Sequence, residues 1–417
     1  MFLKRIHIQH LRGIDDLEMA FDEIGNNRKQ TLVLGENGVG KTNLLRAIAL
    51  VTAGSDAINE LIDTPDDWIS FTKSTAQLEA TLVTQEGQER NIKLVINRGD
   101  TAKDIILNNL NHLDEIDRAL NHATRNYFVV GYGPLRRLNR GTFNRGAEFG
   151  FKQQRASNVA SLFNQEYLLN PLTIWAMEVD YRTDGKGLDI IRESLNDFLP
   201  TIKFHSIDKE KGQLIFRQGN EFVPLHLLSD GYQNMVAWLG DLFYRISNTF
   251  NDYQSPLKAR GLLLIDEIDL HLHPNWQRKV FDFIRYKLPY FQLIATTHSP
   301  LLAQQARQGE LYSLKQVADQ RIVLEAFRGA PDRLLLHQLL MSPAFDVDSD
   351  ESLAVEQLKK DYETLRNRKE TPPQELHELA EQINQLPQTQ RSNMVYEPDQ
   401  IDLLRDIQAE LKARKGE

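Results

Sequence analysis

One glycine-rich segment has the residue types and spacing of a phosphate-binding loop. Residues 35–42 read GENGVGKT and match G-x-x-x-x-G-K-[ST] between an apolar strand, TLVLG, and a helical stretch. Glycines let backbone N–H groups wrap phosphates, while the lysine reaches the terminal phosphates and the threonine hydroxyl serves Mg²⁺. The loop therefore predicts ATP binding by Gly35, Glu36, Asn37, Gly38, Val39, Gly40, Lys41, Thr42 and Asn43.

Two acids end a second apolar strand, which reads GLLLIDE. Parallel strands deliver their last side chains to the sheet edge where nucleotides bind. We expect Asp266 to hold Mg²⁺ together with Thr42, and Glu267 to polarise the attacking water as general base. Acids after an apolar strand are common in themselves. The phosphate-binding loop upstream is what makes this interpretation specific.

A histidine, His298, follows the next apolar strand, FQLIATT. At a strand end beside the catalytic edge it could donate a hydrogen bond to the γ-phosphate or to the attacking water. A lone histidine is usually structural. The order of the three motifs along the chain favours the functional interpretation, so we predict Glu267 and His298 as the catalytic residues.

A fourth motif, LSDGYQ at residues 228–233, lies between the loop and the acidic pair and precedes a helix. It resembles the LSxGx signature of ABC ATPases, and the order of all four motifs is similar to that family. The resemblance implies that Ser229, Asp230 and Gly231 complete the ATP site of another subunit, in a homodimer or higher oligomer. The plainer alternative is that Ser229 only caps the helix.

The start of the chain, FLKRIHIQHLRGIDDLEMAF, together with DEIDLHLHPNWQ and TTHSP, resembles a bacterial branch of that family. This branch contains ATPases related to RecF, Rad50 and the overcoming-lysogenisation-defect (OLD) proteins. The resemblance covers about residues 1–50 and 225–305. It implies that Asp269 lies in a D-loop at the dimer interface, and that a glutamine loop exists, for which Gln153 and Gln154 are the candidates.

The segment YGPLRR, residues 132–137, is similar to a block in the ATPases of phage-defence operons. We therefore expect an ATPase subunit of a bacterial anti-phage complex that resembles the Septu system, in which the ATPase works with a separate HNH nuclease. The alternative is a RecF-like repair ATPase that clamps DNA on ATP-driven dimerisation. The energy subunit of a transporter fits less well.

No nuclease motif is visible in the chain itself. Asp346, Asp348 and Asp350 lack the strand setting of a Toprim nuclease. A calcium loop fails as well, because Glu351 occupies the position that needs glycine and Gln357 the position that needs a bidentate glutamate. We expect the three aspartates to precede a helix that is capped by Ser349 or Asp350.

A basic run begins at the end of the YGPLRR segment and contains interleaved phenylalanines and one acid, Glu148. It could contact a DNA or RNA backbone, or it could be a solvated helical surface that pairs with acids elsewhere. Its cations are Arg136, Arg137, Arg140, Arg145, Lys152 and Arg155.

The elements that must position these motifs indicate an α/β fold, an ABC-type P-loop NTPase sheet with insertions. We expect an ATPase domain over residues 1–345 with a β-hairpin within 76–107 and an inserted helical lobe at about 110–200. Residues 346–417 predict a C-terminal helical hairpin and a further helix. This region either docks a partner or another copy, or folds back onto the ATPase domain.

Bulk composition sets the remaining limits. The chain has 417 residues, 41% of them hydrophobic, no cysteine and a formal net charge of −9. This charge argues against coating nucleic acid through the overall field. No apolar run has membrane-spanning length, and the opening residues lack a signal-peptide pattern. We expect a globular, cytoplasmic protein with no membrane partner, using ATP and Mg²⁺.

Overall fold

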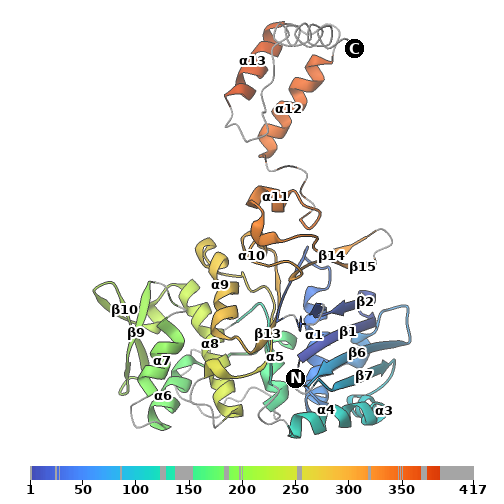
Figure 1. The fold of residues 1–417 in the computed structure, drawn as a ribbon, viewed down its shortest axis with the longest axis vertical. Coiled ribbons are helices and arrows are strands. Elements are labelled where there is room, and N and C mark those ends of the chain that lie inside the picture. Colours follow the sequence, from blue (N-terminus) through green and yellow to red (C-terminus); the bar gives the residue numbers. More distant parts are fainter. Residues whose placement is uncertain are drawn as a thin grey trace. The chain divides into compact units, whose positions relative to one another are not determined.

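The chain forms two compact units, residues 1–346 and 347–417 (Figure 1). The computed structural model describes residues 2–23, 26–27, 29–84, 87–122, 128–136, 154–182, 187–196, 199, 201–250, 256–317, 321–345, 347, 349, 351–367 and 373–385. None of the helices in these ranges is long and apolar enough to cross a membrane.

A six-stranded sheet forms the centre of the first unit. Its order is β15-β14-β5-β13-β12-β8, and all neighbours are parallel except the edge pair β14–β15. The strands that precede the predicted motifs are almost continuously apolar, as expected for a parallel sheet covered on both faces. The bounds are β5 Gln30–Gly35, β8 Val129–Tyr132, β12 Gly261–Ile265, β13 Phe291–Thr297, β14 Leu311–Gln316 and β15 Ile322–Ala326.

Two hydrophobic cores lie on the opposite faces of this sheet. Along β12, Leu262 and Leu264 enter one core, whereas Leu263 and Ile265 enter the other. Figure 1 shows what covers each face: an antiparallel sheet near the N-terminus on one side, and helices with a small sheet on the other. The alternation of side chains along β12 therefore fixes the central sheet between two separate layers.

The N-terminal layer is an antiparallel sheet of order β2-β1-β6-β7. Its β6–β7 pair confirms the predicted hairpin. The bounds are β1 Phe2–Leu11, β2 Ile14–Ala20, β6 Thr75–Val83 and β7 Glu89–Asn97. Around it lie β3 Asp22–Glu23, β4 Asn26–Asn27, α1 Lys41–Thr52, α2 Ser55–Leu61, α3 Ala102–Asn108 and α4 Leu110–His122.

The opposite layer holds the helical lobe and a small sheet of order β11-β10-β9. The stretch of about 110–200, which the sequence predicts to be mostly helical, also contains β8, and this strand joins the central sheet beside β12. The bounds are α6 Leu172–Arg182, α7 Gly187–Asn196, β9 Ile202–Asp208, β10 Gln213–Gln218, β11 Glu221–Pro224 and α8 Asp230–Thr249. The first helix of the lobe, α5 Gln154–Phe163, instead packs beside β8 and against α1 and α2. Three helices follow on: α9 Pro274–Lys287, α10 Pro300–Ala303 and α11 Leu336–Leu340.

The second unit contains a pair of packed helices, α12 (Leu353–Arg366) and α13 (Pro373–Asn384). Tyr362, Ala380 and Ile383 are buried between them. The cap prediction was wrong, because Ser352 is the N-cap of α12 and its hydroxyl accepts from Val355 N at 3.4 Å. The three acids at 346, 348 and 350, and the further helix predicted beyond α13, lie outside the described residues.

Candidate ATP site

The glycine-rich loop connects β5 to α1 and has the backbone of a phosphate cradle. Gly38 and Gly40 have φ of 84° and 95°, in the left-handed region that favours glycine. Lys41 Nζ donates to the carbonyl oxygens of Gly35 (2.9 Å) and Glu36 (2.8 Å). Burial lowers the pKa of Lys41, an effect opposed by the nearby carboxylates, of which Asp266 is the strongest. Lys41 is thus a partly desolvated cation whose Nζ is held by two backbone carbonyls of the loop.

Two oxygen donors meet beside the loop, although they are far apart in the sequence. Thr42 Oγ1 donates to Asp266 Oδ2 at 2.5 Å, and Asp266 is only 1% exposed. The loop is brought to the acidic pair because β5 and β12 flank β13 in the same parallel sheet. A hydroxyl and a carboxylate are hard oxygen ligands of the kind that Mg²⁺ takes together with nucleotide phosphates. The donor set therefore fits the expected cation.

Glu267 stands in an unusual backbone conformation. Its φ is 47°, in the left-handed region that side chains with a Cβ rarely adopt. Its N–H donates to Thr296 Oγ1 at 2.8 Å, and the same hydroxyl donates to Asp266 Oδ1 at 2.5 Å. Strained backbone of this kind is frequent at functional sites. Thr296, which the sequence did not single out, therefore organises both acids through one hydroxyl.

The prediction for Arg136 as a surface cation was wrong. Arg136 is 6% exposed and lies under the acidic pair, where NH2 donates to the carbonyl oxygens of Asp266 (2.8 Å) and Glu267 (2.5 Å). Burial lowers its pKa to about 10, against the attraction of the neighbouring acids. Arg155 pairs with Asp117 at 3.3 Å. The other cations of the basic run lie outside the described residues.

His298 follows β13 with one ring nitrogen unused. Its Nε2 is buried and has no hydrogen-bond partner among the described residues. The preceding residue, Thr297, donates its hydroxyl to Asp269 Oδ1 and accepts from Ser299 N at 2.9 Å. The segment that carries the histidine is thereby fixed to the predicted D-loop. A buried polar atom without a partner is uncommon and is suited to a hydrogen bond with a ligand.

The predicted signature lies at the start of α8. Ser229 is the N-cap residue, yet its exposed side chain makes no capping hydrogen bond. The helix-cap alternative therefore lacks the interaction on which it depends. Asp230 is the first helical residue, and a Cβ added to Gly231 would lie 3.5 Å from the carbonyl oxygen of His271. The signature and the D-loop region are thus adjacent within one copy.

The two glutamine-loop candidates are not joined to the site by the described hydrogen bonds. Gln154 begins α5, and its Nε2 donates to Thr249 Oγ1 at the end of α8 (3.2 Å). Gln153 lies outside the described residues. Near the loop itself, Arg12 NH1 donates to Asn43 Oδ1 at 3.1 Å, which brings another cation to the first turn of α1.

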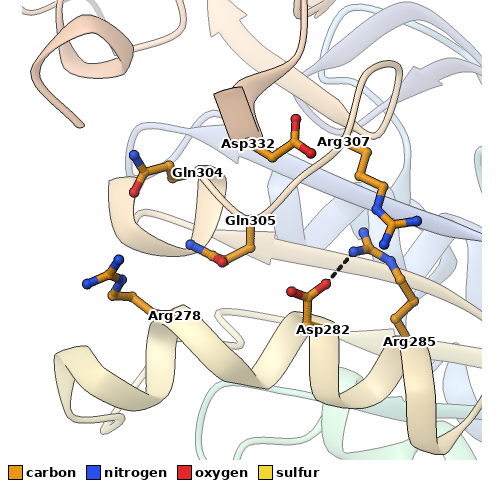
Figure 2. Close-up of a pocket in the computed structure, with 7 residues that line it drawn as sticks. All are labelled: Arg278, Asp282, Arg285, Gln304, Gln305, Arg307 and Asp332. Atoms are coloured by element: carbon orange, nitrogen blue, oxygen red, sulfur yellow. Dashed lines mark hydrogen bonds and ion pairs between the residues drawn. The ribbon is translucent and has the colours of Figure 1, made fainter. Parts of the chain in front are cut away.

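A polar cavity of about 290 Å³ lies between α9 and the segment after α10 (Figure 2). One of its three arginines, Arg285, pairs with Asp282 and also with Glu310. Two acids, Asp282 and Asp332, also line the cavity. The lining residues are Arg278, Asp282, Arg285, Gln304, Gln305, Arg307 and Asp332.

Two families match this chain in comparisons with known proteins. Residues 134–303 match a family described as "AAA domain, putative AbiEii toxin, Type IV TA system", and residues 5–170 match a second family described as "AAA domain". The Septu protein PtuA of Bacillus mycoides is 25% identical over 74% of this chain and 40% of that protein. PtuA of Bacillus thuringiensis is 27% identical over 75% of this chain and 76% of that protein.

A third relative, the OLD nuclease of Thermus scotoductus, is 23% identical over 78% of this chain and 64% of that protein. The chain thus spans well under half of the first PtuA and about three quarters of the second. The two AAA-domain matches together span the loop, the signature, the acidic pair and the histidine. The chain is therefore similar to AAA-domain proteins, among them two Septu PtuA proteins and an OLD nuclease.

Proposed function

We propose that this chain binds ATP with Mg²⁺ and hydrolyses it between two copies of itself, as the ATPase subunit of a bacterial anti-phage complex. In that complex it would regulate a separate HNH nuclease. The observation that carries the ATPase part is the 2.5 Å hydrogen bond between Thr42 and Asp266. This contact between the glycine-rich loop and the acidic pair supports a single site for the phosphates and the cation, as ATP hydrolysis requires.

Each residue of the site has a chemical task in this proposal. The loop amides and Lys41 bind the phosphates, and Thr42 and Asp266 hold Mg²⁺, which offsets phosphate charge when it is bound. Glu267 accepts a proton from the attacking water as general base. The unused Nε2 of His298 is available to the γ-phosphate or to that water. Together, these tasks account for ATP hydrolysis without a further catalytic group.

The two-copy site is supported by the surface around the signature. Ser229 is exposed and makes no cap hydrogen bond, and Gly231 lies beside the backbone of His271. In a second copy this surface would face the γ-phosphate that the first copy holds. One copy alone would then bind ATP but hydrolyse it poorly, because its own signature lies outside its own cradle.

The defence role is supported by the similarity to two Septu proteins. The second unit, with its helical pair, is the region we propose for docking the nuclease or another copy. Co-expression with the neighbouring genes tests this: an HNH protein that co-purifies in fixed ratio supports it. Recovery of DNA without a nuclease would instead favour the RecF-like alternative.

Mixing two inactive variants tests the two-copy site. Lys41→Ala removes the loop's side-chain cation, and Ser229→Arg blocks the signature by bulk and charge. Each variant alone should be nearly inactive. In a mixed dimer, one site combines the intact cradle of the Ser229→Arg copy with the intact signature of the Lys41→Ala copy, so ATP hydrolysis should partly return.

Two affinity tags, one on each variant, verify that mixed dimers form before phosphate release is measured. Phosphate release by the doubly purified dimers supports the proposal. Full activity of Ser229→Arg alone would contradict it, because a signature that tolerates arginine cannot contact a γ-phosphate.

A further inference from the structure

We propose that Arg136 is a positioning residue for ATP hydrolysis. It fixes the turn that presents Glu267 and connects this turn to α8, the helix that begins at the signature. The inference rests on the proposed function, because positioning of Glu267 matters only if Glu267 activates the attacking water. Arg136 itself contacts neither the reacting water nor the nucleotide in this proposal.

The contacts of Arg136 are with the main chain. NH2 donates to the carbonyl oxygens of Asp266 and Glu267, and Nε donates to Gly133 O at 3.2 Å. A guanidinium is a planar, rigid fork of donors, so several carbonyls bound at once are held in fixed relative positions. The side chain therefore determines the path of the backbone through the acidic pair.

The backbone conformation of Glu267 explains why these hydrogen bonds from Arg136 are needed. Its φ of 47° is unfavourable for a residue with a Cβ and persists only where its surroundings enforce it. Thr296 Oγ1 holds the N–H of Glu267 at 2.8 Å, and Arg136 holds its carbonyl oxygen at 2.5 Å. Both sides of the residue are thus fixed. Release of one side would let the turn relax and move the carboxylate away from the attacking water.

Residues 132–136, the segment that ends in Arg136, connect the turn of Glu267 to α8. Tyr132, the last residue of β8, accepts a hydrogen bond from Asp266 N at its carbonyl oxygen (2.8 Å). Its hydroxyl donates to Asp241 Oδ2 on α8 at 3.0 Å, and Tyr132 and Asp241 are 1% and 0% exposed. Residues 132–136 therefore contact α8 at one end and the turn of Glu267 at the other.

This arrangement supplies a physical route between the subunit interface and the general base. A second copy that engages Ser229 acts on the first turn of α8, and a displacement of α8 would act on Tyr132 and then on the turn. Energetic coupling between distant sites is carried by packed, hydrogen-bonded elements that have two arrangements. We infer that hydrolysis depends on this segment, whereas ATP binding to the loop does not.

Arg136→Lys tests the inference, because lysine keeps the positive charge but lacks the planar set of N–H donors of the guanidinium. We expect ATP affinity by calorimetry to stay within about twofold and kcat to fall by about 10- to 100-fold, as for a catalytic group misplaced by about 1 Å. The matched control is Arg98→Lys. Arg98 is more exposed than Arg136, but it also donates to backbone carbonyls, those of Ser70 and Lys73, and it follows β7 in the N-terminal sheet.

A double-mutant comparison separates positioning from a general structural effect. In a Glu267→Gln background, Arg136→Lys should cause little further loss of kcat, because there is no base left to position. Equal losses in both backgrounds would overturn the inference, as would wild-type kcat or a large loss of ATP affinity in Arg136→Lys. Wild-type turnover of Glu267→Gln would instead overturn the proposed function.

If Arg136→Lys fails to fold, as judged by thermal unfolding, kcat and ATP affinity are measured for Tyr132→Phe instead. This change removes a single hydroxyl and its hydrogen bond to Asp241. A kcat reduced by at least about twofold with unchanged ATP affinity supports the route through α8. Unchanged kcat overturns it.

Discussion

Loss of one partner of the buried Asp241–Arg245 ion pair should strongly destabilise the first unit. Asp241 is 0% exposed and accepts from Tyr132 OH (3.0 Å), Asn170 N (2.9 Å), Asn170 Nδ2 (2.8 Å) and Arg245 Nε (2.5 Å). Burial by itself lowers the pKa of Arg245, but the attraction of Asp241 outweighs it and raises that pKa. Asp241→Ala therefore leaves a buried cation without its counter-ion.

The expected magnitude follows from this burial. Removal of one partner of a buried ion pair costs about 3 to 5 kcal/mol of unfolding free energy. For a unit of 346 residues, the unfolding entropy per residue converts this cost into a fall in Tm of about 4 to 7 °C. Arg245→Met in the same chain should recover much of the loss, because no charge is then left buried.

Differential scanning calorimetry measures these shifts. The control is Asp114→Ala, which breaks the exposed pair of Asp114 and Arg118 and should change Tm by less than about 1 °C. A shift for Asp241→Ala no larger than that of the control would refute the reasoning. So would a double variant that is less stable than Asp241→Ala alone.

Two further predictions concern the ATP site. Lys41→Ala should abolish ATP binding in calorimetry, because Lys41 is the side-chain cation of the loop, and undiminished affinity would contradict the cradle assignment. Thr296→Val removes the hydroxyl that bonds both Asp266 and Glu267 N, so phosphate release should slow by about tenfold or more while ATP is still bound; an unchanged rate would show that this hydroxyl is dispensable.

The sequence predicts the parts of this protein whose signals are local. The loop, the acidic pair and the hairpin over β6 and β7 are contiguous patterns in which a strand, a turn or a helix follows at fixed spacing. Their side chains meet because parallel strands end at one edge of the sheet. That edge follows from strand order, so the meeting of Thr42 and Asp266 could be expected.

Residues that act through long-range packing could not be predicted in this way. Thr296 bonds Asp266 across neighbouring strands, and nothing in the run FQLIATT distinguishes it from Thr297. Arg136 stands in a run of cations, and a charge pattern carries no information on which member is buried. Ser352 caps α12 although Ser349 and Asp350 are equally good caps by residue type, because the helix start depends on packing around it.

In the proposed mechanism, Glu267 is the general base of an ATP site formed by the loop and the acidic pair. The most direct test is Glu267→Gln, with ATP binding measured by calorimetry and phosphate release measured at saturating ATP. We predict retained binding and hydrolysis slower by about 10² to 10⁴, which is the usual contribution of a positioned base. Hydrolysis at the wild-type rate would contradict the account.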